Sequence, residues 1–412
     1  MRIRSITYFC NPKYPLDEKV LRAAGEFLAQ ARSAYEAAGY EVQTTRLAAI
    51  PFPKLLGERH IKKLAEYAKQ LDEMIKQVGV AYASLGPALP EIPASYETIP
   101  EAIAAAQNIF FGGVMADNKI GISMKAIRAC AEIIQKSSTI EPNGFANLQF
   151  AALANVRAGA PFFPAAYHDS DAPQFAIAAE SADLAVEAFS GQQTIDDGRR
   201  MLISEITKHG QALAKIAQDL ARLSISSSQP PAFGGIDFSL APFPDDAHSL
   251  GGAVEKMGVP KIGLHGSLAA AAILTEAIER ADFPRVGFNG FMQPVLEDSV
   301  LARRAAEGTL TVKDALLYSA VCGTGLDTVP LPGDTTAGQI APLLLDLCAL
   351  ALRLDKPLTA RLMPIPGRQA GDPTGFDFAF FANSRVMSLD SENLNKPLTS
   401  GESFELYPRS VL

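Results

Sequence analysis

The sequence predicts an α/β protein whose strands are largely parallel and are covered by helices on the outside. Segments with strand-like and helix-like patterns alternate almost throughout the 412 residues. Hydrophobic residues make up 48% of the chain and charged residues 20%, a balance that excludes a disordered or low-complexity protein. Because crossover helices usually join parallel strands, this alternation indicates a sheet buried between helices.

The N-terminal segment shows the pattern most clearly. Residues 2–9 have a strand pattern, and residues 40–47 return to one. Between them, apolar residues recur at steps of three and four, as expected for one face of a helix. These residues are Val20, Leu21, Ala24, Phe27, Leu28, Ala31 and Tyr35. The segment therefore predicts one β-α-β unit.

The same two patterns continue along the rest of the chain. Further strands are expected at residues 80–84, 108–114, 148–154, 175–179, 235–241, 261–264, 286–291, 358–363 and 384–389. Helices are expected at residues 120–135, 195–223, 248–257, 267–281, 299–307 and 336–354.

Residues 224–235 interrupt the alternation with a stretch rich in serine, proline and glycine. Such a stretch is typical of a mobile loop or of a domain linker. The helical patterns on its two sides belong to the same alternation. We therefore expect a loop between two halves of a single α/β domain that spans residues 1–412.

Charge and cysteine content exclude several classes of protein. The formal net charge is −8, so no positive field would draw the chain to nucleic acid or to an anionic membrane. The four cysteines are too far apart for a zinc ribbon or a disulfide framework. The most apolar run, residues 340–352, is too short to span a bilayer and contains Asp346. These features predict a cytoplasmic protein.

Residues 318–336 combine a thiol, glycines, carboxylates and hydroxyls. We expect a loop here, in which Cys322 is a nucleophile or lines the pocket and Asp327 and Asp334 handle protons. Glycines allow a ligand to approach the backbone closely, which makes substrate-binding candidates of Gly323, Gly325 and Gly333. The alternative is structural: the glycines serve turns, and Thr336 with Gln339 forms a capping box. The Gly-Thr-Gly string lacks the third glycine of a dinucleotide fingerprint, so neither NAD nor flavin is expected.

Two histidines are further site candidates. His265 lies at a strand-to-helix transition, and ligands bind at such positions in parallel α/β folds. We expect it to handle protons together with Asp327 or Asp334. His168 follows aromatic residues and is either part of a substrate pocket or a buried structural histidine.

A divalent cation is a possible cofactor, although no ligand spacing identifies one. Asp237 interrupts a strand pattern, and a buried strand tolerates a carboxylate only when it is paired, hydrogen-bonded or metal-bound. Its partners in an oxygen-rich site would be His265, Asp327 and Asp334.

Two arginines are candidates for holding an anion. Arg361 lies among apolar residues of a predicted strand, so it must face a ligand, solvent or one of the aspartates. Arg368 lies in a glycine-rich loop suited to an anionic group. A small anionic metabolite, carrying a carboxylate or a phosphate, is therefore the expected ligand.

Several motifs resemble a family of uncharacterised prokaryotic proteins known as domain of unknown function 711, often labelled "PFL family protein". The motifs are IRSIT (3–7), NGFAN (143–147), GIDFSLAP (235–242), LHG (264–266), PVLED (294–298), AVCGTGLD (320–327), PGD (332–334) and RLMPIPG (361–367). The resemblance implies a ten-stranded α/β barrel similar to that of glycyl radical enzymes such as pyruvate formate-lyase. In that fold two five-stranded parallel halves run antiparallel to each other, with helices outside. The resemblance also implies a functional link to a small ACT-domain protein.

Radical chemistry is not expected, because the nearest string to the radical motif, residues 384–389, has no glycine in place. The sequence thus favours a non-radical lyase, transferase or hydrolase. Arg361 and Arg368 would hold the anion, and His265 with Asp327 or Asp334 would move protons. The alternative is a non-catalytic, small-molecule-binding regulatory protein. A homo-oligomer is compatible with both.

Overall fold

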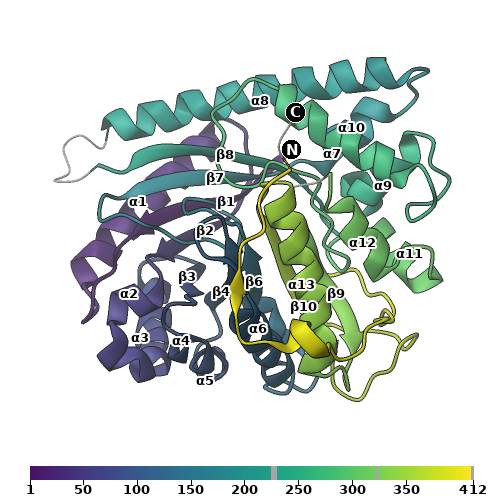
Figure 1. The fold of residues 1–412 in the computed structure, drawn as a ribbon. Helices are drawn as coiled ribbons and strands as arrows, with labels where there is room; N and C mark the ends of the chain where they lie inside the picture. The colour runs from purple at the N-terminus through teal and green to yellow at the C-terminus, as the bar shows by residue number, and fades with distance from the viewer. Residues whose placement is uncertain (224–229, 322–323, 410–412) are drawn as a thin grey trace.

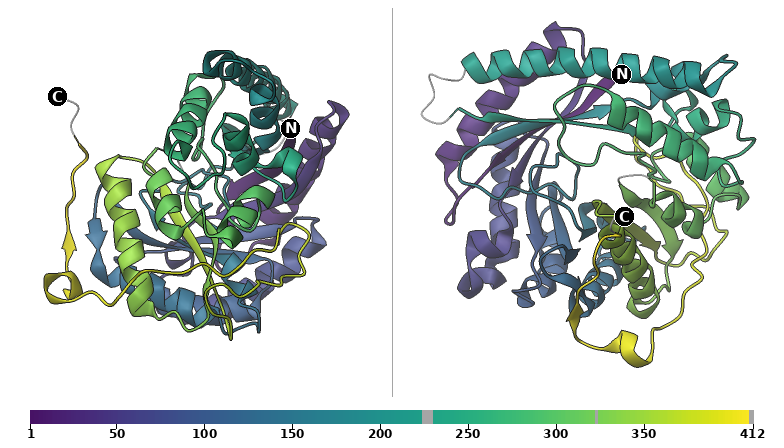
Figure 2. Two further views of the ribbon diagram at one scale, coloured as in Figure 1. Left: turned by 90° about the vertical axis from the view of Figure 1, so that its right-hand side faces the viewer. Right: turned by 45° about the horizontal axis from the view of Figure 1, so that its top comes forward.

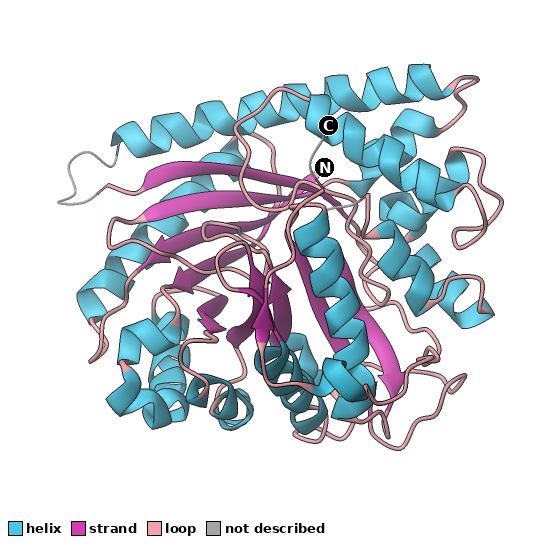
Figure 3. Ribbon diagram, viewed as in Figure 1, coloured by secondary structure: helices cyan, strands magenta, loops and turns pink. Residues whose placement is uncertain are grey.

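The computed structural model describes residues 1–223, 230–321 and 324–409. Its strands form one curved mixed sheet, and most helices lie on the outer side of that sheet (Figure 1, Figure 3). The strands of the described residues are β1 (Arg2–Cys10), β2 (Val42–Ala49), β3 (Tyr82–Ala88), β4 (Ile109–Asp117), β5 (Gly121–Ser123), β6 (Phe150–Ala154), β7 (Gln174–Glu180), β8 (Ala232–Ala241), β9 (Gly325–Pro332), β10 (Leu358–Ile365) and β11 (Ser403–Phe404).

The order of strands across the sheet is β8-β7-β1-β2-β3-β4-β6-β10-β9. The central strands β1, β2, β3, β4 and β6 are parallel to one another. The pairs β7–β8 and β9–β10 run in the opposite direction, because β7 is antiparallel to β1 and β10 is antiparallel to β6. The short strand β5 pairs with β4 and with β11. The expected α/β class is confirmed.

The sheet does not close into the expected ten-stranded barrel within the described residues. Its path of paired strands ends at β8 on one side and at β9 on the other. Residues 284–296 run between these ends and form only isolated bridges, Ile236 with Arg285 and Pro294 with Asp327. The strand expected at residues 286–291 is therefore absent.

Helices cover the outer face. The longer ones are α1 (Glu18–Ala37), α3 (Leu64–Gln77), α6 (Met124–Ser137), α7 (Ala182–Phe189), α8 (Ile195–Leu223), α10 (Ser267–Arg280), α11 (Ser299–Glu307) and α13 (Ala337–Arg353). The shorter ones are α2 (Phe52–Leu56), α4 (Ala94–Glu97), α5 (Ile99–Ala105), α9 (Leu250–Lys256) and α12 (Val312–Tyr318), and 3₁₀ turns occur at η1 (Glu58–Lys63), η2 (Phe145–Gln149), η4 (Asp246–His248) and η5 (Lys396–Thr399).

The views in Figure 2 show that α8 and α13 lie on different parts of the curved sheet. Helix α8 contacts β8, and α13 contacts β10 and β6. None of the helices in the described ranges combines the length and apolar character needed to cross a membrane.

Local sequence signals account for several helix starts. Asp17 accepts a hydrogen bond from the backbone N–H of Lys19 at the start of α1, and Leu21 and Leu28 of this helix are buried. Thr336 and Gln339 form the expected capping box at the start of α13. The expected helices at residues 195–223 and 299–307 match α8 and α11.

Strand β9 lies where the sequence predicts a loop. It contains Pro330 and Pro332, which cannot donate hydrogen bonds to a ladder, and a segment with two prolines reads as a loop. The two prolines are tolerated because β9 is the last strand at one end of the strand order. Only the side of β9 that faces β10 therefore needs a full ladder of backbone hydrogen bonds.

Two other expected strands, 261–264 and 384–389, are not strands. Residues 261–264 form a turn, and the second segment contacts β9 through the single hydrogen bond from Met387 N to Pro330 O (2.9 Å). Of the expected loop at 224–235, residues 224–229 lie outside the described part of the chain, and residues from Ala232 onward belong to β8.

Candidate functional site

A cavity of about 380 Å³ lies against β1, β2, β8, β9 and β10. It is lined by three arginines from three of these strands and by four carboxylates. The arginines are Arg4 of β1, Arg46 of β2 and Arg361 of β10. The carboxylates are Glu141, Asp237, Glu297 and Asp327. What neutralises each arginine determines what the cavity can bind.

Arg361 is paired with two carboxylates. Its Nε donates to Asp327 Oδ1 (2.5 Å), and its Nη2 donates to Glu297 Oε1 (2.8 Å). Burial opposes the charge of Arg361, but Asp327 and Glu297 outweigh burial and raise its pKa. Of the partners that the sequence left open for this arginine, the structure shows an ion pair with an aspartate.

Arg4 is also neutralised. Its Nη1 donates to Glu180 Oε2 (2.9 Å), and its Nη2 donates to Glu297. Gln43 Nε2 donates to the same Glu180 oxygen (2.6 Å) and fixes that carboxylate. Glu297 therefore bridges Arg4 and Arg361, and the two arginines belong to one network of charge-assisted hydrogen bonds.

Arg46 differs, because it forms no ion pair with any described residue. Its Nε donates to Thr44 Oγ1 (2.9 Å), and its guanidinium lies 5.1 Å from the ring centre of Phe163 and 5.8 Å from that of Tyr82. Burial, together with the positive charges of Arg4 and Arg361, lowers the pKa of Arg46 to about 9. The side chain thus remains charged at neutral pH and has two nitrogens, Nη1 and Nη2, without a protein acceptor in the described residues.

Asp327 is a cavity carboxylate with unused hydrogen-bonding capacity. Its Oδ1 accepts from Arg361, whereas its buried Oδ2 has no partner among the described residues. Burial raises the pKa of Asp327, and the charge of Arg361 opposes that shift. A carboxyl group in such surroundings is suited to accept and return a proton.

The carboxylate of Asp237 is occupied by hydrogen bonds from neighbouring residues. It accepts hydrogen bonds from the backbone N–H of Phe288, Asn289 and Ser239 and from the Ser239 hydroxyl. A Cβ on Gly287, which has a φ of +83°, would lie 2.3 Å from Asp237 Oδ2. Asp237 therefore holds residues 287–289 against β8, which explains a carboxylate in this strand.

Three of the residues predicted to share the site lie elsewhere. His265 is exposed in the turn before α10, and Asp334 and Arg368 are exposed beyond the ends of β9 and β10. Asp334 accepts a hydrogen bond from Gln369 Nε2 (3.1 Å). None of the three lines the cavity, so the structure does not bring His265 and Asp334 together with Asp327 and Arg361.

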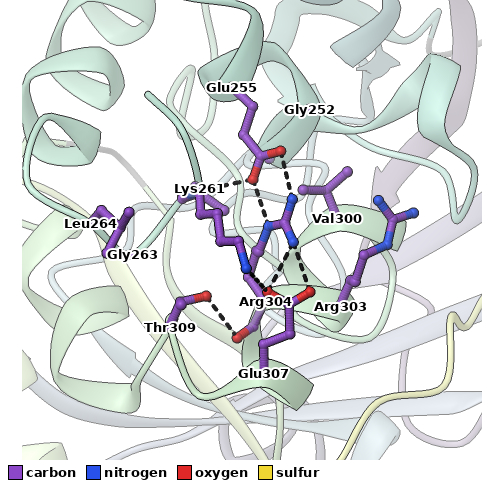
Figure 4. A network of polar contacts seen from close by, with 12 residues as sticks. Gly252, Glu255, Lys261, Gly263, Leu264, Val300, Arg303, Arg304, Glu307 and Thr309 are labelled. Carbon is purple, nitrogen blue, oxygen red and sulfur yellow. Dashed lines mark hydrogen bonds and ion pairs between the residues drawn. The ribbon is translucent and has the colours of Figure 1, made fainter. Parts of the chain in front are cut away.

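The turn that carries His265 is fixed by an ion-pair network (Figure 4). Glu255 accepts from Ile262 N (3.1 Å) and from Arg304, whose Nε is 2.7 Å away. Lys261 pairs with Glu307 (2.8 Å), which also accepts from Arg304 (2.8 Å). The polar residues around this turn join α9 to α11 instead of forming a ligand site.

His168 is buried, and one of its ring nitrogens, Nε2, is 2.8 Å from Ala172 O. It does not line the cavity, so its position agrees with the alternative of a buried structural histidine. Gly325 and Gly333 are also outside the cavity wall, and a Cβ on either would lie 2.2 Å from a backbone oxygen, that of Thr359 or of Ile365. These glycines allow close packing of β9 on β10.

Cys322 and Gly323, predicted as nucleophile and ligand-binding glycine, lie outside the described residues. The predicted cation ligands Asp237, His265, Asp327 and Asp334 do not assemble. Across residues 1–223, 230–321 and 324–409, no three His, Cys, Asp or Glu side chains are placed to hold a metal ion together.

Sequence reasoning missed Arg4, Arg46 and Glu297. The signal was present, because Arg4 and Arg46 lie in predicted strands, as Arg361 does. A charged side chain within a buried strand needs a partner or a ligand, which makes Arg4 and Arg46 candidates for the same reason as Arg361 and Asp237.

The chain is similar to proteins from archaea and bacteria. A UPF0210 protein of Pyrobaculum aerophilum is 32% identical over 353 residues, which cover 81% of this chain and 76% of the relative. A UPF0210 protein of Methanocaldococcus jannaschii is 27% identical over 401 residues, which cover 93% and 87%. One from Clostridium perfringens is 24% identical over 401 residues, with the same coverage. These names state no activity.

A family model described as "Uncharacterised ACR (DUF711)" matches residues 1–383. The family expected from the motifs is thereby confirmed, whereas a likeness to glycyl radical enzymes is not shown. The chain belongs to the DUF711 (UPF0210) family of uncharacterised proteins.

Proposed function

We propose that this protein is an enzyme that binds a small anionic metabolite in the central cavity, with Arg46 as the residue that holds the anion. One observation carries the proposal: Arg46 faces the cavity with a charged guanidinium that no described carboxylate neutralises. Leaving a partly buried charge unpaired is unfavourable, and an anionic ligand would supply the missing partner. A guanidinium can bind a carboxylate or a phosphate through two parallel hydrogen bonds.

Asp327 is the proposed proton-transfer group of this enzyme. Its Oδ2 is unpaired and its pKa is raised, so the group can take up a proton from a bound molecule or return one. Arg361 holds Asp327 in place through Oδ1, and Glu297 in turn fixes Arg361. The chemistry that these residues support is a non-radical lyase, transferase or hydrolase reaction with proton transfer.

The proposed architecture around this site is a single domain in which residues 284–296, although they form no strand, fill the gap between β8 and β9. Two isolated bridges support this, one to β8 and one to β9, together with the hydrogen bonds Val286 N to Ile236 O (3.1 Å) and Val295 N to Asp327 O (3.0 Å). In this arrangement the cavity would be enclosed by the sheet and by this segment.

The proposal is tested with a library of small carboxylates and phosphates, screened for thermal stabilisation of the wild type and of Arg46→Gln. Compounds that stabilise only the wild type are then assayed for turnover by wild type and Asp327→Asn, after circular dichroism has confirmed that both variants fold. Turnover lost in Asp327→Asn, with binding retained, supports an enzyme. If compounds bind through Arg46 but none is converted, the protein is a non-catalytic binder. If stabilisation is the same in Arg46→Gln, the anion site is wrong.

A further inference from the structure

The cavity that contains Arg46 is lined by a second group of residues, the phenylalanines of a surface loop. Residues 376–381 read Phe-Asp-Phe-Ala-Phe-Phe. Asp377 and Ala379 are exposed, so this loop lies at the surface, whereas Phe378 and Phe380 are half-buried and line the cavity. The loop therefore covers part of the cavity with two aromatic rings.

The loop is held in this position by its own hydrogen bonds. Asn383 Oδ1 accepts from Gly375 N (2.8 Å) and Phe376 N (2.7 Å), and Asn383 Nδ2 donates to Phe376 O (2.9 Å). Ala382 N donates to Leu296 O (2.6 Å), next to Glu297 of the ion-pair network. The rings are thus placed by a fixed backbone and are ready to bind a ligand without reordering.

A third ring extends this wall. Phe145 of η2 also lines the cavity, and its ring centre is 5.1 Å from that of Phe378, which is 5.4 Å from that of Phe380. All three rings are half-buried. When an apolar group of a ligand covers aromatic surface in a cavity, the burial of that surface stabilises the complex. Offset or edge-on contacts between rings add to this stabilisation.

The charges of the lining limit the ligand to one negative charge. Arg4 and Arg361 are neutralised by carboxylates, so Arg46 is the one available cation among the described residues that line the cavity. Glu141, Asp237, Glu297 and Asp327 also line the cavity and would repel a second negative charge on the ligand. The Arg46 guanidinium lies near Phe163 and Tyr82, and stacking on rings leaves the edge of a guanidinium free for the two parallel hydrogen bonds that a carboxylate accepts.

The geometry points to a monocarboxylate that carries an aromatic ring as the ligand of this cavity. Its carboxylate pairs with Arg46, and its ring packs on Phe145, Phe378 and Phe380. This inference rests on the proposed function, because it specifies the ligand class of the same site. It assigns to Phe145, Phe378 and Phe380 the recognition of the apolar part of the ligand.

Titration calorimetry of the whole chain tests the head group and the ring separately. The carboxylate probes are acetate, phenylacetate and 4-phenylbutyrate, and the phosphate probes are inorganic phosphate and phenyl phosphate. We expect phenylacetate or 4-phenylbutyrate to bind at least about tenfold more tightly than acetate, since one buried phenyl ring removes substantial apolar surface from water. The same compound should bind more tightly than phenyl phosphate, because the carboxylates of the lining repel a second negative charge.

Variants assign these preferences to residues. Phe378→Ala and Phe380→Ala should each reduce the affinity for the preferred phenyl carboxylate by about five- to tenfold and leave acetate binding unchanged. The matched control is Tyr407→Ala, which removes an aromatic ring that is 68% exposed and does not line the cavity, and it should change neither. Phe378→Leu keeps an apolar side chain and shows whether the effect of Phe378→Ala comes from lost packing or from a disturbed loop.

The outcomes separate the two proposals. Equal affinity for acetate and both phenyl carboxylates overturns the aromatic ligand and leaves the Arg46 anion site standing. Tighter binding of phenyl phosphate overturns the carboxylate head group. Binding that persists unchanged in Arg46→Gln, or no binding of any probe, overturns the anion site itself. Ring-dependent binding that requires both Arg46 and Phe378 supports the inference.

Discussion

Arg361 and Arg46 line the same cavity but differ in what surrounds their charge. Arg361 is 6% exposed and is held by Asp327 and Glu297 at 2.5 and 2.8 Å. Arg46 contacts a hydroxyl and two rings, and no described carboxylate. The more buried arginine is therefore part of the protein's own ion-pair network, and the less buried one is available to a ligand. A candidate binding site is better identified by an unpaired charge than by a buried one.

Removal of Arg361 should have the largest effect on stability. Arg361→Ala leaves Asp327 and Glu297 in a buried place without their shared partner, which typically lowers the free energy of unfolding by about 3–5 kcal/mol. Denaturant unfolding measures this loss. A variant as stable as the wild type would show that the network contributes nothing to folding.

Replacement of Glu297 should sharpen the comparison, because this carboxylate neutralises both Arg4 and Arg361. We expect Glu297→Gln to lower the free energy of unfolding by about 1–3 kcal/mol and to increase affinity for anions, since one negative charge is removed from the cavity wall while Arg4 and Arg361 keep only Glu180 and Asp327 as carboxylate partners. Unfolding and calorimetric titration with acetate test the two effects. Reduced anion binding would place Glu297, and not Arg46, at the centre of the site.

Arg46→Gln should behave in the opposite way to Arg361→Ala. The change removes an unpaired charge, so stability should stay within about 0.5 kcal/mol of the wild type or increase. Anion affinity should fall by about tenfold or more, the usual contribution of a charge-assisted hydrogen-bonded pair. A strongly destabilised Arg46→Gln would contradict the assignment of Arg46 to ligand binding.

The stability of the ion-pair network should depend on pH through Asp327. Its pKa in the folded protein lies above the ordinary value of 3.8, so the folded state binds the proton more tightly than the unfolded state does. The resulting stabilisation is fully present below the unfolded pKa and is lost as pH rises through the folded pKa. The wild type should therefore become more stable relative to Asp327→Asn as pH falls from neutral toward 4. Unfolding measured across this range, with a constant difference between the two proteins, would contradict the raised pKa.

The smallest effect is expected at His265. This histidine is exposed and lies outside the cavity, so His265→Ala should change neither stability nor anion binding measurably. Arg368→Ala is the matched change at another exposed candidate. A loss of anion binding in either variant would restore the site predicted from the sequence.

The sequence predicts the central strands and α1, α8 and α13 well because their apolar periodicity is local. It predicts a loop where the structure has β9, because Pro330 and Pro332 suit a loop as well as a strand at the end of a sheet. Apolar periodicity does not show whether the sheet closes into a ring. Closure depends on residues 284–296, which contact β8 and β9 through isolated bridges only.

For the site, the sequence identifies Arg361, Asp237 and Asp327, because charged residues next to apolar runs are conspicuous. It cannot show that Arg361 is already paired, since that depends on which strands lie side by side. The contact between Arg4 and Glu297 joins residues 293 positions apart, and no spacing along the chain indicates it. His265 and Asp334 are attractive in sequence because they lie near glycine turns, yet those turns are away from the cavity.

The most direct test of the Arg46 site is anomalous diffraction from bromide-soaked crystals of the wild type and of Arg46→Gln. Bromide reports where a single negative charge is bound without knowledge of the natural ligand. The structure predicts a bromide peak within hydrogen-bonding distance of the Arg46 guanidinium in the wild type, and its loss in Arg46→Gln. Bromide found at Arg361 or Arg368, with none at Arg46, would contradict the account.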